Sequence, residues 1–195
     1  MTMRILVAAG GTGGHIFPAL AALRELRARR PDLEVRWLGG RRGLEAQMVP
    51  DAGYRLDRLV LRTLRSVDLS VNTVLDPVRL AASVPQAVAY MLRWRPDVVY
   101  TTGGYVAIPT LAAAAALRVP SLMWEGNRIA GRSVRMTARF ASALAVSYAG
   151  TADELPGRVY LTGTPIRDVS DIDPATARAQ LSIPPDLPVL FVFGG

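Results

Sequence analysis

The chain has 195 residues, half of them apolar, which is enough for one full domain and a piece of a second. It contains no cysteine, so disulfides and thiol chemistry are excluded, and the longest apolar stretch, 106–117, is shorter than the roughly 20 residues of a membrane span. The net charge of +7 favours an anionic partner, but the basic residues, all arginine, are dispersed without aromatic interleaving, which argues against nucleic acid.

A strand, a glycine turn and a helix open the chain. The apolar run 5–9 is typical of a buried strand, and glycines fill positions 10, 11, 13 and 14. A helix is predicted over 16–30, with Pro18 in its first turn, where a missing N–H costs nothing. Glycines permit close approach of a ligand, and a helix N-terminus offers unpaired N–H groups to a phosphate. The turn is therefore predicted to bind an anionic group.

Two common nucleotide loops do not fit this turn. The dinucleotide pattern G-x-G-x-x-G accommodates Gly11 and Gly13 but meets Ile16 at the third glycine, and no acidic residue ends the second predicted strand. A Walker A loop needs a lysine, and the chain has none. An anion loop of another kind remains, with a tight ligand-free turn as the alternative.

Predicted strands and helices alternate through the middle of the chain. Strands are expected at 34–38, 55–60, 96–100, 120–124, 143–147 and 158–161. Helices are expected at 43–49, from Asp76-Pro77 to about 92, at 108–117 and at 130–140. This alternation predicts an α/β fold, a parallel sheet with helices on both faces.

Three polar or glycine-rich segments follow predicted strands. They are the turn 10–14, a second glycine turn at 101–105, and Glu125 with Asn127. Parallel sheets bind ligands outside the carboxyl ends of their strands. The sequence therefore predicts that these segments converge on one site.

The character of the chain changes after residue 165. Residues 168–188 are polar and proline-bearing, with a short helix expected at 175–181, and 189–193 form a new buried-strand pattern before two glycines. We expect one domain at 1–165, and at 166–195 a linker with the first strand of a second domain. This organisation suggests a truncated chain or the product of a split gene.

Four segments together resemble glycosyltransferase family 28, and within it the bacterial N-acetylglucosaminyltransferases of peptidoglycan synthesis. They are GGTGGHIFPALA (10–21), TTGGYVAIP (101–109), WEGNRIAG (124–131) and TGTPIR (162–167). The resemblance implies a Rossmann-like domain, the N-terminal half of a GT-B fold, peripheral at the cytoplasmic face of the membrane. It also implies an inverting transfer of GlcNAc from UDP-GlcNAc to lipid I (undecaprenyl-diphosphate-MurNAc-pentapeptide), giving lipid II, without a cofactor.

The resemblance carries roles to individual residues. His15 becomes a general base or hydrogen-bond partner of the acceptor hydroxyl, or it only orders the loop, and Glu125 orients or deprotonates that hydroxyl, or merely caps a loop. The substrate-binding residues that it implies are Thr12, Gly13, Gly14, Gly103, Gly104, Tyr105, Asn127 and Arg167. For the second turn a capping role with a packing tyrosine is the alternative, and for Arg167 a solvated linker charge.

The chain departs from the family at one motif. Trp124-Glu125-Gly126-Asn127 stands where the family commonly has His-Glu-Gln-Asn. The role of Glu125 is unaffected in principle, but contacts made by the lost histidine and glutamine side chains are in doubt.

An apolar and basic stretch around 69–80, expected to be irregular, is a candidate membrane contact. The candidate residues are Val74, Leu75, Val78 and Arg79 within this stretch and Arg65 just before it, which combine apolar burial with attraction to anionic lipid. Ordinary core packing is the alternative for the valines.

The resemblance thus predicts four partners: UDP-GlcNAc, lipid I, an anionic membrane surface and a missing C-terminal domain. No nucleic acid and no metal site are expected, since the chain has one histidine and no cysteine. The chain alone is expected to be inactive because most of the donor pocket is absent. The alternative is a non-catalytic partner, either a membrane-recruiting subunit of a split glycosyltransferase or a nucleotide-binding module. A dinucleotide module is disfavoured by Ile16 and the missing acid.

Overall fold

A computed structural model describes residues 2–40, 43–61, 71–167, 169 and 172–192, without the side chains of 71–75. Its seven strands form one sheet in the order β3-β2-β1-β4-β5-β6-β7, and every adjacent pair is parallel. The strands are β1 Arg4–Ala9, β2 Glu34–Gly39, β3 Arg55–Arg58, β4 Val98–Gly103, β5 Ser121–Glu125, β6 Ala143–Val146 and β7 Val159–Leu161. The helices are α1 Gly13–Arg29, α2 Glu45–Asp51, α3 Val71–Trp94, α4 Ala107–Ala116, α5 Arg132–Thr137, the 3-10 turn η1 Ala138–Phe140, α6 Ala149–Ala152 and α7 Pro174–Gln180.

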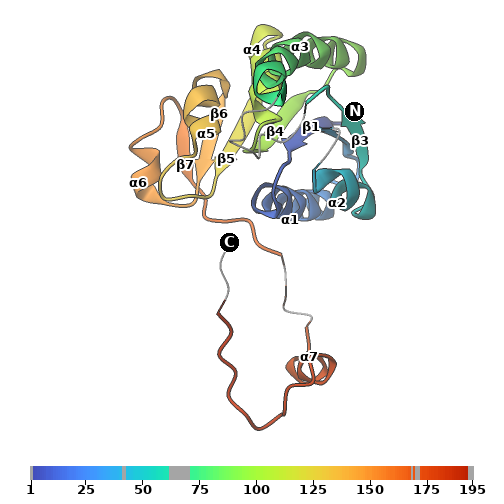
Figure 1. Ribbon diagram of the computed structural model, residues 1–195, viewed down its shortest axis with the longest axis vertical. Helices are drawn as coiled ribbons and strands as arrows, with labels where there is room; N and C mark the ends of the chain where they lie inside the picture. The colour runs from blue at the N-terminus through green and yellow to red at the C-terminus, as the bar shows by residue number, and fades with distance from the viewer. Residues whose placement is uncertain (1, 41–42, 62–70, 168, 170–171, 193–195) are drawn as a thin grey trace.

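Helices cover both faces of this sheet (Figure 1). Alternate residues of β1 point to opposite sides: Leu6 packs in a core with α3 and α4, and Val7 packs in a second core with α1 and α2. A third core joins α4 and α5 to β5 and β6. Because a strand buried on both faces must be apolar throughout, the run 5–9 has the composition that this position needs. The predicted α/β class is confirmed.

The strand order reverses between β1 and β4, which lie side by side in the middle of the sheet. Strands β2 and β3 extend to one side of this pair, and β5, β6 and β7 extend to the other. At such a point the connecting loops diverge and leave a crevice at the carboxyl ends of the strands. Ala9 and Gly103 are register partners at those ends, so both glycine turns begin at this point of the sheet.

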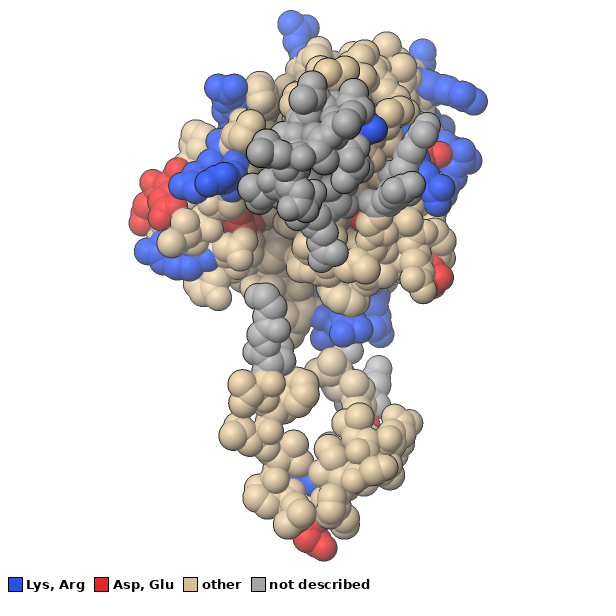
Figure 2. Space-filling model, in the orientation of Figure 1, with Lys and Arg blue, Asp and Glu red and all other residues tan. Residues whose placement is uncertain are grey.

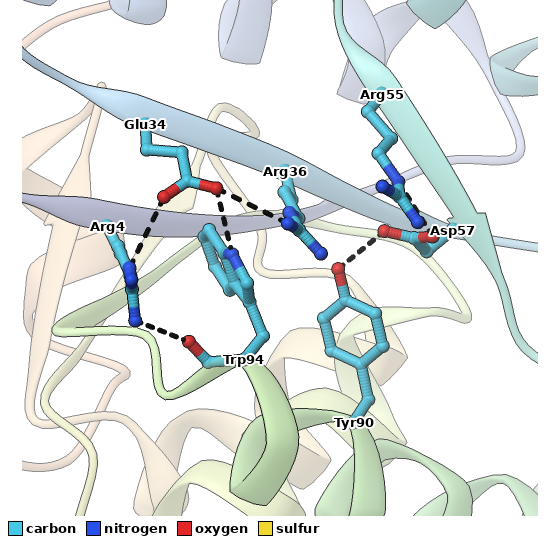
Figure 3. A network of polar contacts seen from close by, with 7 residues as sticks. All are labelled: Arg4, Glu34, Arg36, Arg55, Asp57, Tyr90 and Trp94. Carbon is cyan, nitrogen blue, oxygen red and sulfur yellow. Dashed lines mark hydrogen bonds and ion pairs between the residues drawn. The ribbon is translucent and has the colours of Figure 1, made fainter.

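A polar network fastens the sheet to the end of α3, and Figure 3 draws it. The Glu34 carboxylate accepts bonds from Arg4 Nε (3.3 Å), Trp94 Nε1 (3.1 Å) and an Arg36 guanidinium nitrogen (3.4 Å). The Trp94 bond, with the two arginine charges, lowers the pKa of Glu34. Tyr90 extends the network by donating to Asp57.

Three expectations about local structure are wrong: the start of α1, the start of α3 and the strand at 189–193. Helix α1 begins at Gly13, so Pro18 lies in its second turn and removes an N–H that would have bonded the Gly14 carbonyl. Helix α3 begins at Val71, so Asp76-Pro77 does not start it and the stretch is not irregular from 71 onward. A proline costs a helix one backbone bond without preventing turns before it.

The described part of the predicted strand 189–193 is also not a strand. Residues 189–192 pair with none of the described strands, and Leu190 is 90% exposed. An apolar run becomes a buried strand only where neighbouring strands and a second layer receive it. Figure 1 shows this segment and α7 in a loop that extends away from the sheet.

None of the described helices is both long and apolar enough to cross a membrane.

Candidate functional site

The two glycine turns touch through their backbones. Gly103 and Gly104 have φ of +95° and +83°, and a Cβ on Gly104 would lie 2.5 Å from the Gly10 carbonyl oxygen. A Cβ on Gly103 would lie 3.3 Å from the His15 ring. Both the backbone conformation and the close approach therefore require glycine at 104. The expected meeting of segments 10–14 and 101–105 is present.

His15 sits where these turns meet. Its Nδ1 lies 3.1 Å from Thr12 Oγ1, its ring bonds the Gly10 carbonyl, and its own backbone carbonyl accepts a 2.6 Å bond from Thr102 Oγ1. Burial lowers the pKa of the imidazole below its ordinary 6.5, while the charge of Glu125 and the bond to Gly10 oppose the shift. The lowered pKa favours the neutral imidazole, which is the form that can accept a proton.

The third predicted segment, at Glu125, lies on the strand next to β4, and the charge of its carboxylate raises the pKa of His15 against the effect of burial. Glu125 ends β5 next to β4, and the residue is 4% exposed. One oxygen accepts bonds from the backbone N–H and side-chain amide of Asn127 (2.8 and 2.7 Å), and the other from Gly131 N–H (2.8 Å). The carboxylate thus holds the loop between β5 and α5 in shape, an arrangement that favours orientation over proton abstraction.

The start of α1 lies beside the second glycine turn and has no side-chain cap. Thr12 occupies the N-cap position in extended backbone conformation, but its hydroxyl contacts His15 and makes no cap hydrogen bond. Helix geometry gives the N–H groups of Gly13 and Gly14 no partner within the helix. These donors and the helix dipole together suit an anionic group.

Tyr105 lies differently from its expected role as a substrate contact. It is 7% exposed, and its hydroxyl donates to Glu45, a residue that the sequence analysis did not select. This arrangement favours the alternative of a packing tyrosine in the second turn. The signal that could have indicated Glu45 is the cluster Gly39, Gly40 and Gly43 just before it, since glycines gather where backbone meets a bulky buried group.

Two further predicted residues lie at the margin of the site. Asn127 is exposed while its amide is bonded to Glu125, and its backbone carbonyl accepts from Thr151 (2.9 Å). The exposed Arg167 guanidinium lies 4.6 Å from the ring centre of Phe17, one turn into α1. Arg167 therefore lies beside the helix that carries the first glycine turn.

Trp124 and Gly126, the two residues that depart from the family motif, fit each other sterically. A Cβ on Gly126 would collide with the Trp124 ring. That ring is 5% exposed and donates from Nε1 to the Gly163 carbonyl (3.1 Å), which ties β5 to the segment after β7. The large indole at 124 thus requires the absence of a side chain at 126.

The candidate membrane residues are only partly described. Arg65 and the side chains of Val74 and Leu75 lie outside the described residues. Val78 is 61% exposed on α3, and Arg79 bonds Asp76 at 3.0 Å. On the face shown in Figure 2 arginines are dispersed around the periphery. Among the described residues no three metal-ligating side chains gather.

Comparison with known proteins identifies the family. The model of the glycosyltransferase family 28 N-terminal domain matches residues 5–146. The chain belongs to glycosyltransferase family 28. The resemblance indicated by the sequence motifs is therefore confirmed, and the crevice between β1 and β4 belongs to a family 28 N-terminal domain.

Curated relatives of this family 28 chain share one name, UDP-N-acetylglucosamine–N-acetylmuramyl-(pentapeptide) pyrophosphoryl-undecaprenol N-acetylglucosamine transferase. The chain is 34% identical to the protein of Lactiplantibacillus plantarum over 99% of its own length and 53% of the relative. It is 41% identical to that of a Synechococcus species over 98% of its own length and 51% of the relative. The chain therefore spans about half the length of these curated relatives.

Solved structures share the fold of this chain. The MurG crystal structure from Acinetobacter baumannii matches 87% of the chain and 47% of its own, with a TM-score of 0.69 at 27% identity. A UDP-GlcNAc 2-epimerase from Neisseria meningitidis matches with a TM-score of 0.60 at 13% identity, which shows the shared fold alone. The expected N-terminal half of a GT-B fold is confirmed by the MurG match.

Proposed function

We propose that this chain is the acceptor-side half of an inverting N-acetylglucosaminyltransferase that converts lipid I into lipid II with UDP-GlcNAc as donor. The observation that carries the proposal is the contact between the two glycine turns. His15 lies between these turns, and the charge of Glu125 affects the pKa of its ring. Relatives that bear the transferase name at up to 41% identity support the assignment of donor and acceptor.

The acceptor diphosphate would meet the start of α1. The N–H groups of Gly13 and Gly14 and the positive end of the helix dipole would face its charged oxygens. Thr12, Gly103, Gly104 and Asn127 would line the remainder of the acceptor and sugar site.

His15 would act as the general base. A neutral imidazole accepts the proton of the C4 hydroxyl as the hydroxyl oxygen bonds to the anomeric carbon of GlcNAc, and UDP leaves with the electron pair of the broken bond. Attack from the face opposite UDP inverts the anomeric carbon. Glu125 would stabilise the imidazolium that forms and hold the loop of Asn127.

The rest of the donor site would come from a second domain. We propose a domain at 1–165 and a linker with the start of the next domain at 166–195. The sheet ends at Leu161, Trp124 holds the Gly163 carbonyl, and nearly all described residues beyond 165 are exposed. Arg167, on this linker and next to α1, would meet a phosphate of the nucleotide or acceptor.

We also propose peripheral binding at the cytoplasmic membrane face through the start of α3. Exposed Val78 supports an apolar contact there. In co-sedimentation with anionic vesicles, the double variant Arg65→Glu with Arg79→Glu should lose binding. Unchanged binding would refute this membrane contact.

The transferase test combines the chain with the C-terminal half of the Synechococcus relative and measures lipid II formation. We expect no turnover by the chain alone and lipid II when both halves are present. Size-exclusion chromatography reports whether the halves associate. Association without any lipid II would contradict the transferase and favour a non-catalytic, membrane-recruiting subunit.

A further inference from the structure

The Glu45 side chain is fully buried between the loops that surround the crevice. It is 0% exposed at the first residue of α2. One carboxylate oxygen accepts from Gly11 N–H (2.9 Å), and the other accepts from Gly40 N–H (3.2 Å) and from the Tyr105 hydroxyl. One side chain therefore bonds the first glycine turn, the end of β2 and the second glycine turn.

The surroundings of Glu45 are shaped to receive it. A Cβ on Gly10 or Gly39 would lie 2.9 Å from a Glu45 atom, and one on Gly43 would lie closer still. Three glycines from three places thus leave room for this one carboxylate. A buried acidic group is costly unless hydrogen-bonded, and here three donors satisfy it.

The bond to Gly11 determines which way the first turn faces. Gly11 has φ of +91°, and its N–H donates to the buried Glu45 carboxylate, so it is not free to bind a ligand. The donors left for a ligand are then those of Gly13 and Gly14 at the start of α1. The bond to Tyr105 fixes the second turn against the same carboxylate, so the two turns keep one relative position.

We propose that Glu45 is a positioning residue for the acceptor site, which sets the first glycine turn so that the α1 N-terminus meets the acceptor diphosphate. This inference rests on the proposed function and extends it to a residue that does not touch the substrate. Its effect is geometric, because a negative charge close to a diphosphate is by itself unfavourable to binding.

The charge of Glu45 and its hydrogen bonds have opposite expected effects on diphosphate binding, so one substitution can distinguish them. Glu45→Gln removes the negative charge and would strengthen diphosphate binding if charge dominated. Its amide group, however, brings an NH2 donor against Gly11 N–H, or against Gly40 N–H and the Tyr105 hydroxyl. Either Gly11 N–H or Gly40 N–H then loses its acceptor, because the Tyr105 hydroxyl can turn and accept from the NH2 group but a backbone N–H cannot. Binding weakens if geometry dominates.

The test uses the 195-residue chain with farnesyl diphosphate as a soluble polyprenyl diphosphate. Affinity is measured by calorimetry, and amide hydrogen exchange of Gly11 is measured by NMR. For Glu45→Gln we expect about tenfold weaker binding and faster exchange at Gly11 or Gly40, whichever N–H faces the new NH2 group. Tyr105→Phe should weaken binding less and leave Gly11 protected. The matched control is Glu34→Gln, in the network at the other end of the strands, which should bind as the wild type does.

The possible outcomes distinguish the proposed function from the positioning role of Glu45. Binding by Glu45→Gln as tight as that of the wild type, or tighter, would overturn the inference while leaving the proposed function intact. A wild-type chain that binds no farnesyl diphosphate would contradict the proposed function and the inference with it. If Glu45→Gln does not fold, Tyr105→Phe provides the test. The inference would be overturned if Tyr105→Phe binds farnesyl diphosphate as tightly as the wild type and the NMR signal of Gly104 is unchanged.

In the enzyme completed with a second half, the KM values give a further readout. Glu45→Gln should raise KM for lipid I and leave KM for UDP-GlcNAc unchanged. A general loss of folding would not produce that separation, and an equal rise of both KM values would count against the inference.

Discussion

At the residue scale, His15 combines a contact with both glycine turns and an environment that keeps its ring neutral. Its backbone carbonyl bonds Thr102, its ring bonds the first turn, and Glu125 acts on it from the third segment. A residue placed in this way reports on the whole site, because moving any of the three segments changes its surroundings.

The first prediction concerns the pH dependence of this histidine. Burial lowers its pKa below 6.5, so a base at His15 loses activity only as the pH falls through that lowered value. In the completed enzyme, kcat/KM should show an acid limb with a midpoint below 6.5. His15→Gln should lower kcat by about 100- to 10,000-fold and abolish that limb. An acid limb that persists in the variant would mean that His15 only orders the loop.

The second prediction concerns the contact between the turns. Gly104→Ala combines a positive φ with a Cβ that meets the Gly10 carbonyl, and it should lower the free energy of unfolding by about 2–5 kcal/mol. Gly157→Ala is the control, since Gly157 has φ of +87° and nothing within 4 Å. It should cost about 1–2 kcal/mol. Equal losses in urea unfolding would show that the turns do not press together.

From the sequence we could predict the site residues that follow the ends of strands, but not Glu45, whose buried side chain bonds the two glycine turns. The two glycine turns and Glu125 were predicted because parallel strands place their carboxyl ends at one edge. Glu45 was missed because an acidic residue at the start of a short helix is usually solvated. Only the fold shows that three glycines and Tyr105 enclose it.

At the element scale, the third prediction tests the pairing of Trp124 with Gly126 at the end of β5. Gly126→Ala should destabilise the chain by about 1–3 kcal/mol because its methyl group meets the buried indole. In the Trp124→Phe background the smaller ring should relieve the collision. A double-mutant cycle in urea unfolding should then give a coupling of about 1 kcal/mol or more. Additive costs would refute the pairing.

Element boundaries show where local patterns stop being informative. Asp76-Pro77 is a common helix start, yet α3 begins at Val71 and carries Pro77 within it. The run 189–192 has a buried-strand composition but is exposed and unpaired in the described chain. In the first case a helix-start pattern lies inside a longer helix, and in the second an apolar run has no neighbouring strand among the described residues with which to pair.

At the scale of the whole molecule, the described strands form one parallel sheet whose two glycine turns meet at the carboxyl ends of β1 and β4. The chain spans 53% of the Lactiplantibacillus plantarum relative, and the proposed division places acceptor recognition in this half and most donor recognition in the other. Such a division predicts that acceptor binding survives without the second half, although turnover does not.

The most direct test of that division is an NMR titration of the 195-residue chain with farnesyl diphosphate, following every assigned backbone amide. We predict that the largest shift changes occur together at Gly13 and Gly14, at Gly103 and Gly104, and at Asn127. Shift changes confined to another face of the domain, or at one of these segments without the others, would contradict a common acceptor site.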